Sequence, residues 1–90
     1  MSGYKFDGRN LISSGSRVGE VRGNDIYESG SRIGEVRGND IYSHGKRVGE
    51  LRGNDIYSQG YRVGTLTDAR RAIDGPGGAT LAALWLLLVK

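Results

Sequence analysis

Residues 24–38 read NDIYESGSRIGEVRG, and this segment recurs along the chain. Residues 39–53 read NDIYSHGKRVGELRG, and the segment from Asn54 reads NDIYSQGYRVGTLTD. A weaker copy begins at Arg9 and reads RNLISSGSRVGEVRG. Self-similarity at a fixed period marks a repeat architecture. The 90 residues therefore predict one small domain built from four β-hairpin units with a 15-residue period.

Each unit carries two turn signals. The Gly-Asn pairs at 23–24, 38–39 and 53–54 predict two-residue hairpin loops of the primed types, in which positive φ is needed. The second turn signals are Ser14-Gly15, Ser29-Gly30, His44-Gly45 and Gln59-Gly60. The stretches between these loops are short and β-like, so we expect an antiparallel meander of short strands.

The loops predict the pairing register of the strands. A two-residue loop at 23–24 places Val21 opposite Ile26, and a loop at 29–30 places Ile26 opposite Ile33. Directly opposed residues share one face of a sheet. The same count gives four inner apolar rows: Phe6-Leu11-Val18, Val21-Ile26-Ile33, Val36-Ile41-Val48 and Leu51-Ile56-Val63.

One conflict in this register is informative. Ile33 and Val36 lie three residues apart on one strand, so strict alternation would put them on opposite faces. Gly34 falls between them, and a glycine inside a strand commonly marks a bulge or a sharp bend. The equivalent glycines are Gly19, Gly49 and Gly64. We therefore expect every long strand to bend at its glycine, so that four units close into a ring or cup.

The pattern changes after Leu66. Thr67-Asp68 predicts the start of a short helix over 69–73, and the residues from Gly75 to Gly78 predict a linker. The apolar segment 79–89 is rich in alanine and leucine, which favours a helix, although LWLLLV alone also fits a final strand. A helix that is apolar on all sides is buried or lies in a membrane. We expect it to plug the ring.

The predicted fold class is therefore mostly β with one C-terminal helix. The hairpin repeats occupy residues 4–67, the helical turn and Gly/Pro linker residues 68–78, and the apolar helix packed in the ring residues 79–90. The GNDIYxxGxRVGEVRG units and the leucine-rich tail resemble the four-fold β-flower proteins of bacteria, from about Phe6 to Lys90. This resemblance implies the same architecture and no catalytic residue. The first unit departs from the pattern at Leu11-Ile12, and the last departs at Thr65 and Thr67.

One polar pattern repeats on the outer face of the predicted sheet. It comprises the rows Glu20-Tyr27-Arg32, Glu35-Tyr42-Arg47 and Glu50-Tyr57-Arg62. These rows could form a platform of three aromatic rings rimmed by charge, suited to sugars or planar groups. The simpler interpretation is structural, because an arginine can lie over a tyrosine ring and cross-strand pairs stabilise the outside of a sheet. We retain the rows as a possible interaction face.

The other candidate sites have simpler interpretations. The pairs Arg22-Asp25, Arg37-Asp40 and Arg52-Asp55 flank the tight turns, and one carboxylate per turn is too few for Ca²⁺. We expect exposed ion pairs there. His44, the single histidine, has no partner for acid–base work or metal binding. The Gly75–Gly78 stretch lacks the Lys and Ser/Thr of a phosphate-binding loop. We predict no catalytic residue, no metal and no cofactor.

Composition narrows the function classes further. The net charge is +3, but most arginines alternate with Glu and Asp, so nucleic acid is not the expected partner. The chain has no cysteine, the N-terminus resembles no secretory signal, and the apolar tail is too short to span a membrane. A cytoplasmic location fits these features. The partner and the oligomeric state stay open.

Three functions remain in competition. The leading hypothesis is a non-enzymatic structural or interaction module that recognises another protein or a polymer. The second is membrane association, in which the apolar tail leaves the ring and inserts into lipid. The third is a carbohydrate- or cell-wall-binding repeat that uses the outer-face tyrosines.

Overall fold

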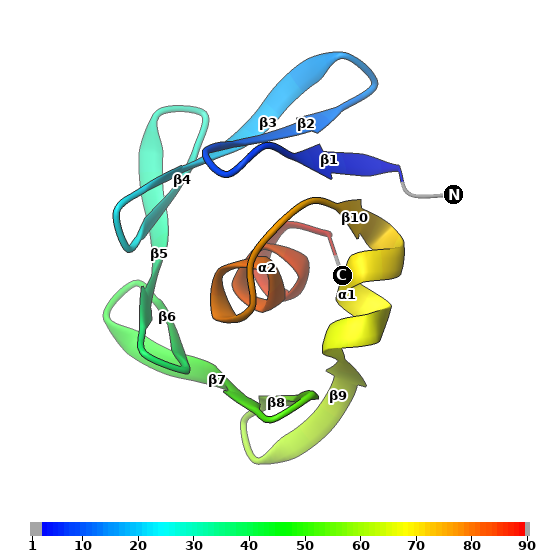
Figure 1. Cartoon of the computed structure of the whole chain (residues 1–90). Helices are drawn as coiled ribbons and strands as arrows, with labels where there is room; N and C mark the ends of the chain where they lie inside the picture. The colour runs from blue at the N-terminus through cyan, green and yellow to red at the C-terminus, as the bar shows by residue number, and fades with distance from the viewer. Residues whose placement is uncertain (1–2, 90) are drawn as a thin grey trace.

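The computed structural model describes residues 3–89, which form one ten-stranded sheet and a helical C-terminal segment (Figure 1). The predicted mostly β fold with a C-terminal helix is confirmed. The strands are β1 (Tyr4–Phe6), β2 (Asn10–Ser13), β3 (Ser16–Arg22), β4 (Asp25–Glu28), β5 (Ser31–Arg37), β6 (Asp40–Ser43), β7 (Lys46–Arg52), β8 (Asp55–Ser58), β9 (Tyr61–Thr65) and β10 (Ile73–Asp74). The sheet is open, and its strand order runs from β10 through β1 to β9.

The register across the Gly-Asn loops agrees with the prediction. Val21 pairs with Ile26, and the equivalent pairs are Val36 with Ile41 and Leu51 with Ile56. In these loops φ is 61° at Gly23 and 60° at Gly38 and Gly53. The asparagine that follows each glycine does not have a positive φ. Positive φ at the first loop residue alone is the pattern of a type II′ turn, which matches the twist of a hairpin.

The predicted pairing across the other loops is wrong by one residue. Ile26 pairs with Gly34, whereas Tyr27 still pairs with Arg32, so Ile33 is the extra residue of a bulge. The same shift occurs at Leu11, Ile41 and Ile56, which pair with Gly19, Gly49 and Gly64. A bulge sets two residues against one and bends the strand, which explains how Ile33 and Val36 can both pack against the core.

The loops with Ser, His or Gln before glycine place two residues in the left-handed region. φ is 54° at Ser14, 52° at Ser29 and His44, and 53° at Gln59, and the following glycines have φ from 80° to 88°. Positive φ at both loop residues is the type I′ pattern, for which Asn-Gly is the preferred sequence. Each loop therefore holds one non-glycine residue in a conformation that costs about 1–2 kcal/mol.

The segment after β9 departs from the prediction in two ways. Helix α1 covers Leu66–Ala72 instead of 69–73, and Thr65, not Thr67, is its N-cap. The Thr65 hydroxyl accepts a hydrogen bond from the Asp68 N–H at 3.2 Å, and the Asp68 carboxylate accepts one from the Thr65 N–H at 3.0 Å. This reciprocal capping box fixes the helix start. Ile73 and Asp74 then form β10, which pairs in parallel with β1 and was not predicted.

The apolar C-terminal segment is helical, so the alternative of a final strand is wrong. Helix α2 covers Ala79–Leu84 and continues as one π-helical segment, η1 (Trp85–Val89). Figure 1 shows the sheet curving around α2, with α1 between the β9 and β10 ends of the sheet. Residues 81–84 of α2 are fully buried, as are Leu11, Ile26, Ile41 and Ile56 on the inner face of the sheet.

Four consecutive side chains of this helical segment meet four glycines of the sheet. A Cβ built on Gly19 would lie 2.8 Å from Cδ1 of Leu88, and one on Gly34 would lie 2.6 Å from Cδ1 of Leu87. Such a Cβ on Gly49 would lie 2.6 Å from Leu86, and on Gly64 2.5 Å from Trp85. The glycines therefore leave room for the helix side chains, in addition to marking the bulges.

No helix among residues 3–89 is long and apolar enough to cross a membrane.

Candidate functional site: the outer face of the sheet

The predicted outer rows are adjacent in space. Tyr27 pairs with Glu20 on β3 and with Arg32 on β5, and Tyr42 and Tyr57 have the equivalent neighbours. The three tyrosines are half-buried, whereas the arginines Arg32, Arg47 and Arg62 are exposed. Among the glutamates, Glu35 and Glu50 are half-buried and Glu20 is buried, with 7% of its surface exposed. The rows form one continuous polar surface across β3 to β9.

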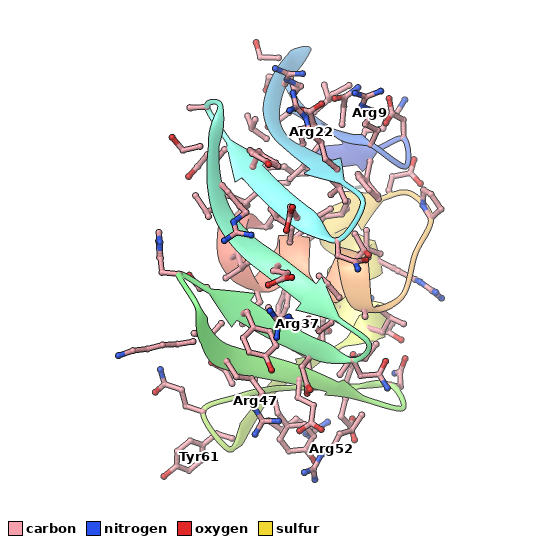
Figure 2. All side chains as sticks on the ribbon, turned by 90° about the vertical axis from the view of Figure 1, so that its left-hand side faces the viewer. Arg9, Arg22, Arg37, Arg47, Arg52 and Tyr61 are labelled. Atoms are coloured by element: carbon pink, nitrogen blue, oxygen red, sulfur yellow. The ribbon has the colours of Figure 1, made fainter. Side chains whose placement is uncertain are left out.

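The arginines that lie over the tyrosine rings are not those of the predicted rows. The guanidinium carbon of Arg22 lies 5.1 Å from the ring centroid of Tyr27. Arg37 lies 5.0 Å from the Tyr42 centroid, and Arg52 lies 5.2 Å from the Tyr57 centroid. Figure 2 looks onto this outer face and labels Arg22, Arg37 and Arg52. The sequence pattern predicts only turn ion pairs for these three arginines and gives no sign of their contact with the rings.

The ion pairs also differ from the prediction. Arg32 Nη1 lies 3.3 Å from Asp25, Arg47 Nη1 lies 3.3 Å from Asp40, and Arg62 Nη1 lies 3.5 Å from Asp55. The predicted pairing of these aspartates with Arg22, Arg37 and Arg52 is wrong. Those arginines instead bond the glutamate two positions earlier, at 3.1 to 3.3 Å. Arg22, Glu20 and Asp25 all share one face of the sheet, but the guanidinium of Arg22 lies over Tyr27 and beside Glu20, while Asp25 is bonded by Arg32.

Glu20 is the most enclosed charged group of this face. Its carboxylate lies 3.3 Å from Arg22 Nε, 3.3 Å from Arg9 Nε and 3.8 Å from Arg17 Nη1. Burial raises the pKa of the Glu20 carboxyl, but the hydrogen bond and charge of Arg22, with the other two arginines, outweigh it. The pKa of Glu20 therefore lies below its ordinary value of 4.5. The neighbouring carboxylate likewise stabilises the charged form of Arg37 and raises its pKa, chiefly through the hydrogen bond to Glu35.

Three depressions open on the outer face, one at each junction between consecutive hairpins. Their volumes are about 110, 250 and 230 Å³ in chain order. Each is lined by an arginine, the bulge glycine with the apolar residue before it, a glutamate, a tyrosine and the following type I′ loop. The corresponding side chains are Arg17, Glu20 and Tyr27, then Arg32, Glu35 and Tyr42, then Arg47, Glu50 and Tyr57. We call these the wall depressions.

The other candidate sites of the sequence, His44 and the Gly75–Gly78 linker, do not form a chemically active arrangement. His44 sits at the rim of the second wall depression, in the left-handed loop position, and it is exposed. In the linker, a Cβ on Gly75 would collide with the Phe6 carbonyl oxygen, so this glycine serves close packing beside β1. Within residues 3–89, no group of three or more His, Asp or Glu side chains could hold a metal ion.

The wall depressions can bind polar groups more readily than a sugar ring. Arg37 and Arg52 also line the second and third wall depressions. A guanidinium has five N–H donors, and the Nε of each of these two arginines faces the neighbouring glutamate, which leaves the terminal nitrogens for a ligand. The guanidinium of Arg22, Arg37 or Arg52 covers a face of each tyrosine, on which a sugar would have to stack.

Comparisons with protein-family models, curated proteins and solved structures found no match for this chain.

Proposed function

We propose that this chain is a non-enzymatic interaction module that binds another protein through its outer face. The three wall depressions carry this proposal, because consecutive units present the same arginine, glutamate and tyrosine to solvent. Arginine and tyrosine are enriched at protein–protein interfaces, where they combine a large contact area with directional hydrogen bonds. A partner with carboxylates or carbonyl oxygens at a matching spacing would meet the free guanidinium donors.

We infer further that the scaffold is a ring of four repeated hairpin units around the C-terminal helix, as in the four-fold β-flower proteins that the sequence resembles. The contacts of Trp85, Leu86, Leu87 and Leu88 with one glycine from each unit support this arrangement. A helical segment turns by roughly a quarter of a circle per residue, so four consecutive side chains point in four different directions. Such a scaffold would hold the outer-face side chains at fixed positions.

The two other hypotheses receive less support. A sugar would have to displace the arginine that lies over each tyrosine ring. Insertion of the whole tail into lipid would expose Leu81 and Leu84, which are fully buried, together with the inner face of the sheet. The apolar area lost from the core would offset the area gained in the membrane.

The decisive experiment compares two variants of the full chain as bait in cross-linking enrichment from the source cells. The wall variant carries Arg37→Gln and Arg52→Gln, and the matched control carries Arg70→Gln and Arg71→Gln on the exposed face of α1. Both variants remove two positive charges, and circular dichroism checks that both are folded. We expect a partner that the wild type and the control retain and the wall variant loses.

The partner is then purified, and its Kd is measured by calorimetry for all three chains. Loss of binding in the wall variant alone supports the proposal. Equal affinity for the wall variant and the wild type would overturn it. A catalytic turnover that the wall substitutions abolish would also overturn it.

A further inference from the structure

One end of the molecule exposes apolar side chains around the end of the helix. Residues 81–84 of α2 are fully buried, whereas all five residues of η1, Trp85–Val89, are half-buried. Five consecutive helical residues cover every direction around the axis. Exposure of all five therefore means that the helix meets solvent at its end, not along one side.

The burial of the apolar side chains on the inner face of the sheet changes at the same level along the helix axis. On the strand segments after the bulge glycines, Val21, Val36 and Leu51 are buried, with 6% to 9% of their surface exposed. Before the glycines, on the side of the type I′ loops, the apolar residues are only half-buried. These residues are Val18, Ile33, Val48 and Val63. Together with Trp85–Val89 they form the surface that we call the open end.

The rim of the open end is basic. The segments 14–17, 28–32, 43–47 and 58–62, which contain the type I′ loops and their flanks, hold five basic residues and one acidic residue, Glu28. The basic residues are Arg17, Arg32, Lys46, Arg47 and Arg62. Of the 13 basic and 10 acidic residues in the chain, this leaves eight basic and nine acidic residues elsewhere. The positive charge of the protein is thus concentrated in these segments.

Two side chains of the rim reach into solvent. Tyr61 is 76% exposed and lies at the lower left of the molecule in Figure 2. Lys46 is exposed and has no ion pair within the described part of the chain. The four arginines pair with carboxylates on the outer face, but their side chains stay 56% to 58% exposed. A long arginine side chain can reorient toward an interface while its stem stays on apolar surface.

We propose that the open end docks on the surface of an anionic lipid bilayer. The apolar residues of the open end enter the boundary between headgroups and acyl chains, and the basic rim meets the lipid phosphates and carboxylates. Tyr61 has the amphipathic ring that favours this boundary. The charge distribution selects lipid over a second copy of the chain, because two such ends facing each other would bring ten basic side chains and two acidic ones together.

The test measures binding of the full chain to vesicles by flotation, in about 0.1 M salt. Vesicles of phosphatidylcholine with phosphatidylserine are compared with vesicles of phosphatidylcholine alone. Trp85, the single tryptophan, reports the open end directly through its emission. We expect binding to the anionic vesicles only, with a blue shift of Trp85 and quenching by brominated acyl chains.

Two variants locate the docking surface without touching the core. Ser16→Lys with Ser31→Lys adds two charges at exposed rim positions, and Asn24→Lys with Asn39→Lys adds the same charge at the exposed type II′ loops of the opposite end. Each lysine near an anionic surface contributes about 1 kcal/mol, so the rim variant should bind about tenfold more tightly or better. The control should gain much less.

The proposal would be overturned by no binding to anionic vesicles, by equal gains for the rim variant and its control, or by binding without any change in the emission of Trp85. A concentration-dependent dimer that shields Trp85 in the absence of lipid would assign the open end to a second copy instead. Binding that survives in phosphatidylcholine alone with unchanged affinity would remove the role of the basic rim.

Discussion

The contacts between the bulge glycines and the helix predict unequal effects of the same substitution. In Gly34→Ala, the new Cβ lies 2.6 Å from Cδ1 of Leu87 and 2.8 Å from the Tyr42 carbonyl oxygen. In Gly19→Ala, it lies 2.8 Å from Cδ1 of Leu88 but 3.4 Å from the Tyr27 carbonyl oxygen. The end of a leucine side chain can move, whereas a carbonyl within a strand pairing is held by its neighbours.

The magnitudes follow from two opposing effects. Overpacking a filled site costs about 1–3 kcal/mol. Neither glycine has positive φ, so alanine fits the backbone and recovers about 0.4–1 kcal/mol by restricting the unfolded chain. We expect Gly34→Ala to lower the free energy of unfolding by about 1.5–2.5 kcal/mol and Gly19→Ala by about 1 kcal/mol or less.

The assay is urea unfolding at 25 °C, followed by far-ultraviolet circular dichroism, as a double-mutant cycle with the contacting leucine. Leu88→Ala should remove nearly the whole effect of Gly19→Ala, because the Leu88 side chain supplies its one close contact. Leu87→Ala should leave most of the effect of Gly34→Ala, since the Tyr42 carbonyl remains. Equal losses for the two glycine substitutions, or complete rescue of Gly34→Ala by Leu87→Ala, would refute this reasoning.

Three further predictions concern the loops, the buried carboxylate and the tail. His44→Asn should raise the free energy of unfolding by about 0.5–1 kcal/mol, because asparagine tolerates the left-handed loop position, and thermal unfolding against His44→Ala checks it. The lowered pKa of Glu20 means that its contribution is complete above pH 4.5 and is lost as the pH falls through the lower folded-state value. The urea midpoint should therefore fall with acid less steeply in Glu20→Gln, and identical acid profiles would contradict this. A chain ending at Gly78 should lose cooperative unfolding in calorimetry, and retention of a sharp transition would show that the helix is dispensable.

The sequence predicted the strands well because each loop has a sequence signature with a physical cause. Glycine supplies positive φ in the loops at 23–24, 38–39 and 53–54, and the alternation of side chains then gives the register. The bulge was predicted at the glycine, but its extra residue was not identified. Counting residues from the loop gives Ile26 opposite Ile33, and only the bulge geometry shows that Gly34 takes that place.

The parts that the sequence did not predict depend on tertiary contacts. Strand β10 is two residues long, which is too short to show a strand pattern in the sequence. Its pairing with β1 depends on where α1 ends. The partners of the outer-face arginines follow from side-chain direction, which a Cα register does not contain. Arg22 stands opposite Asp25 in the register but bonds Glu20 on its own strand and lies over Tyr27.

The directions in which the side chains point also explain why the C-terminal segment is a helix and not a strand. A strand points alternate side chains to two opposite faces, so WLLL in a strand could meet at most two sides of an enclosing sheet. Trp85, Leu86, Leu87 and Leu88 instead meet Gly64, Gly49, Gly34 and Gly19 in turn. These glycines are 15 residues apart, while the contacting side chains are adjacent in sequence. Only a helical segment, which turns by roughly a quarter of a circle per residue, lets neighbouring side chains contact four successive segments of the curved sheet.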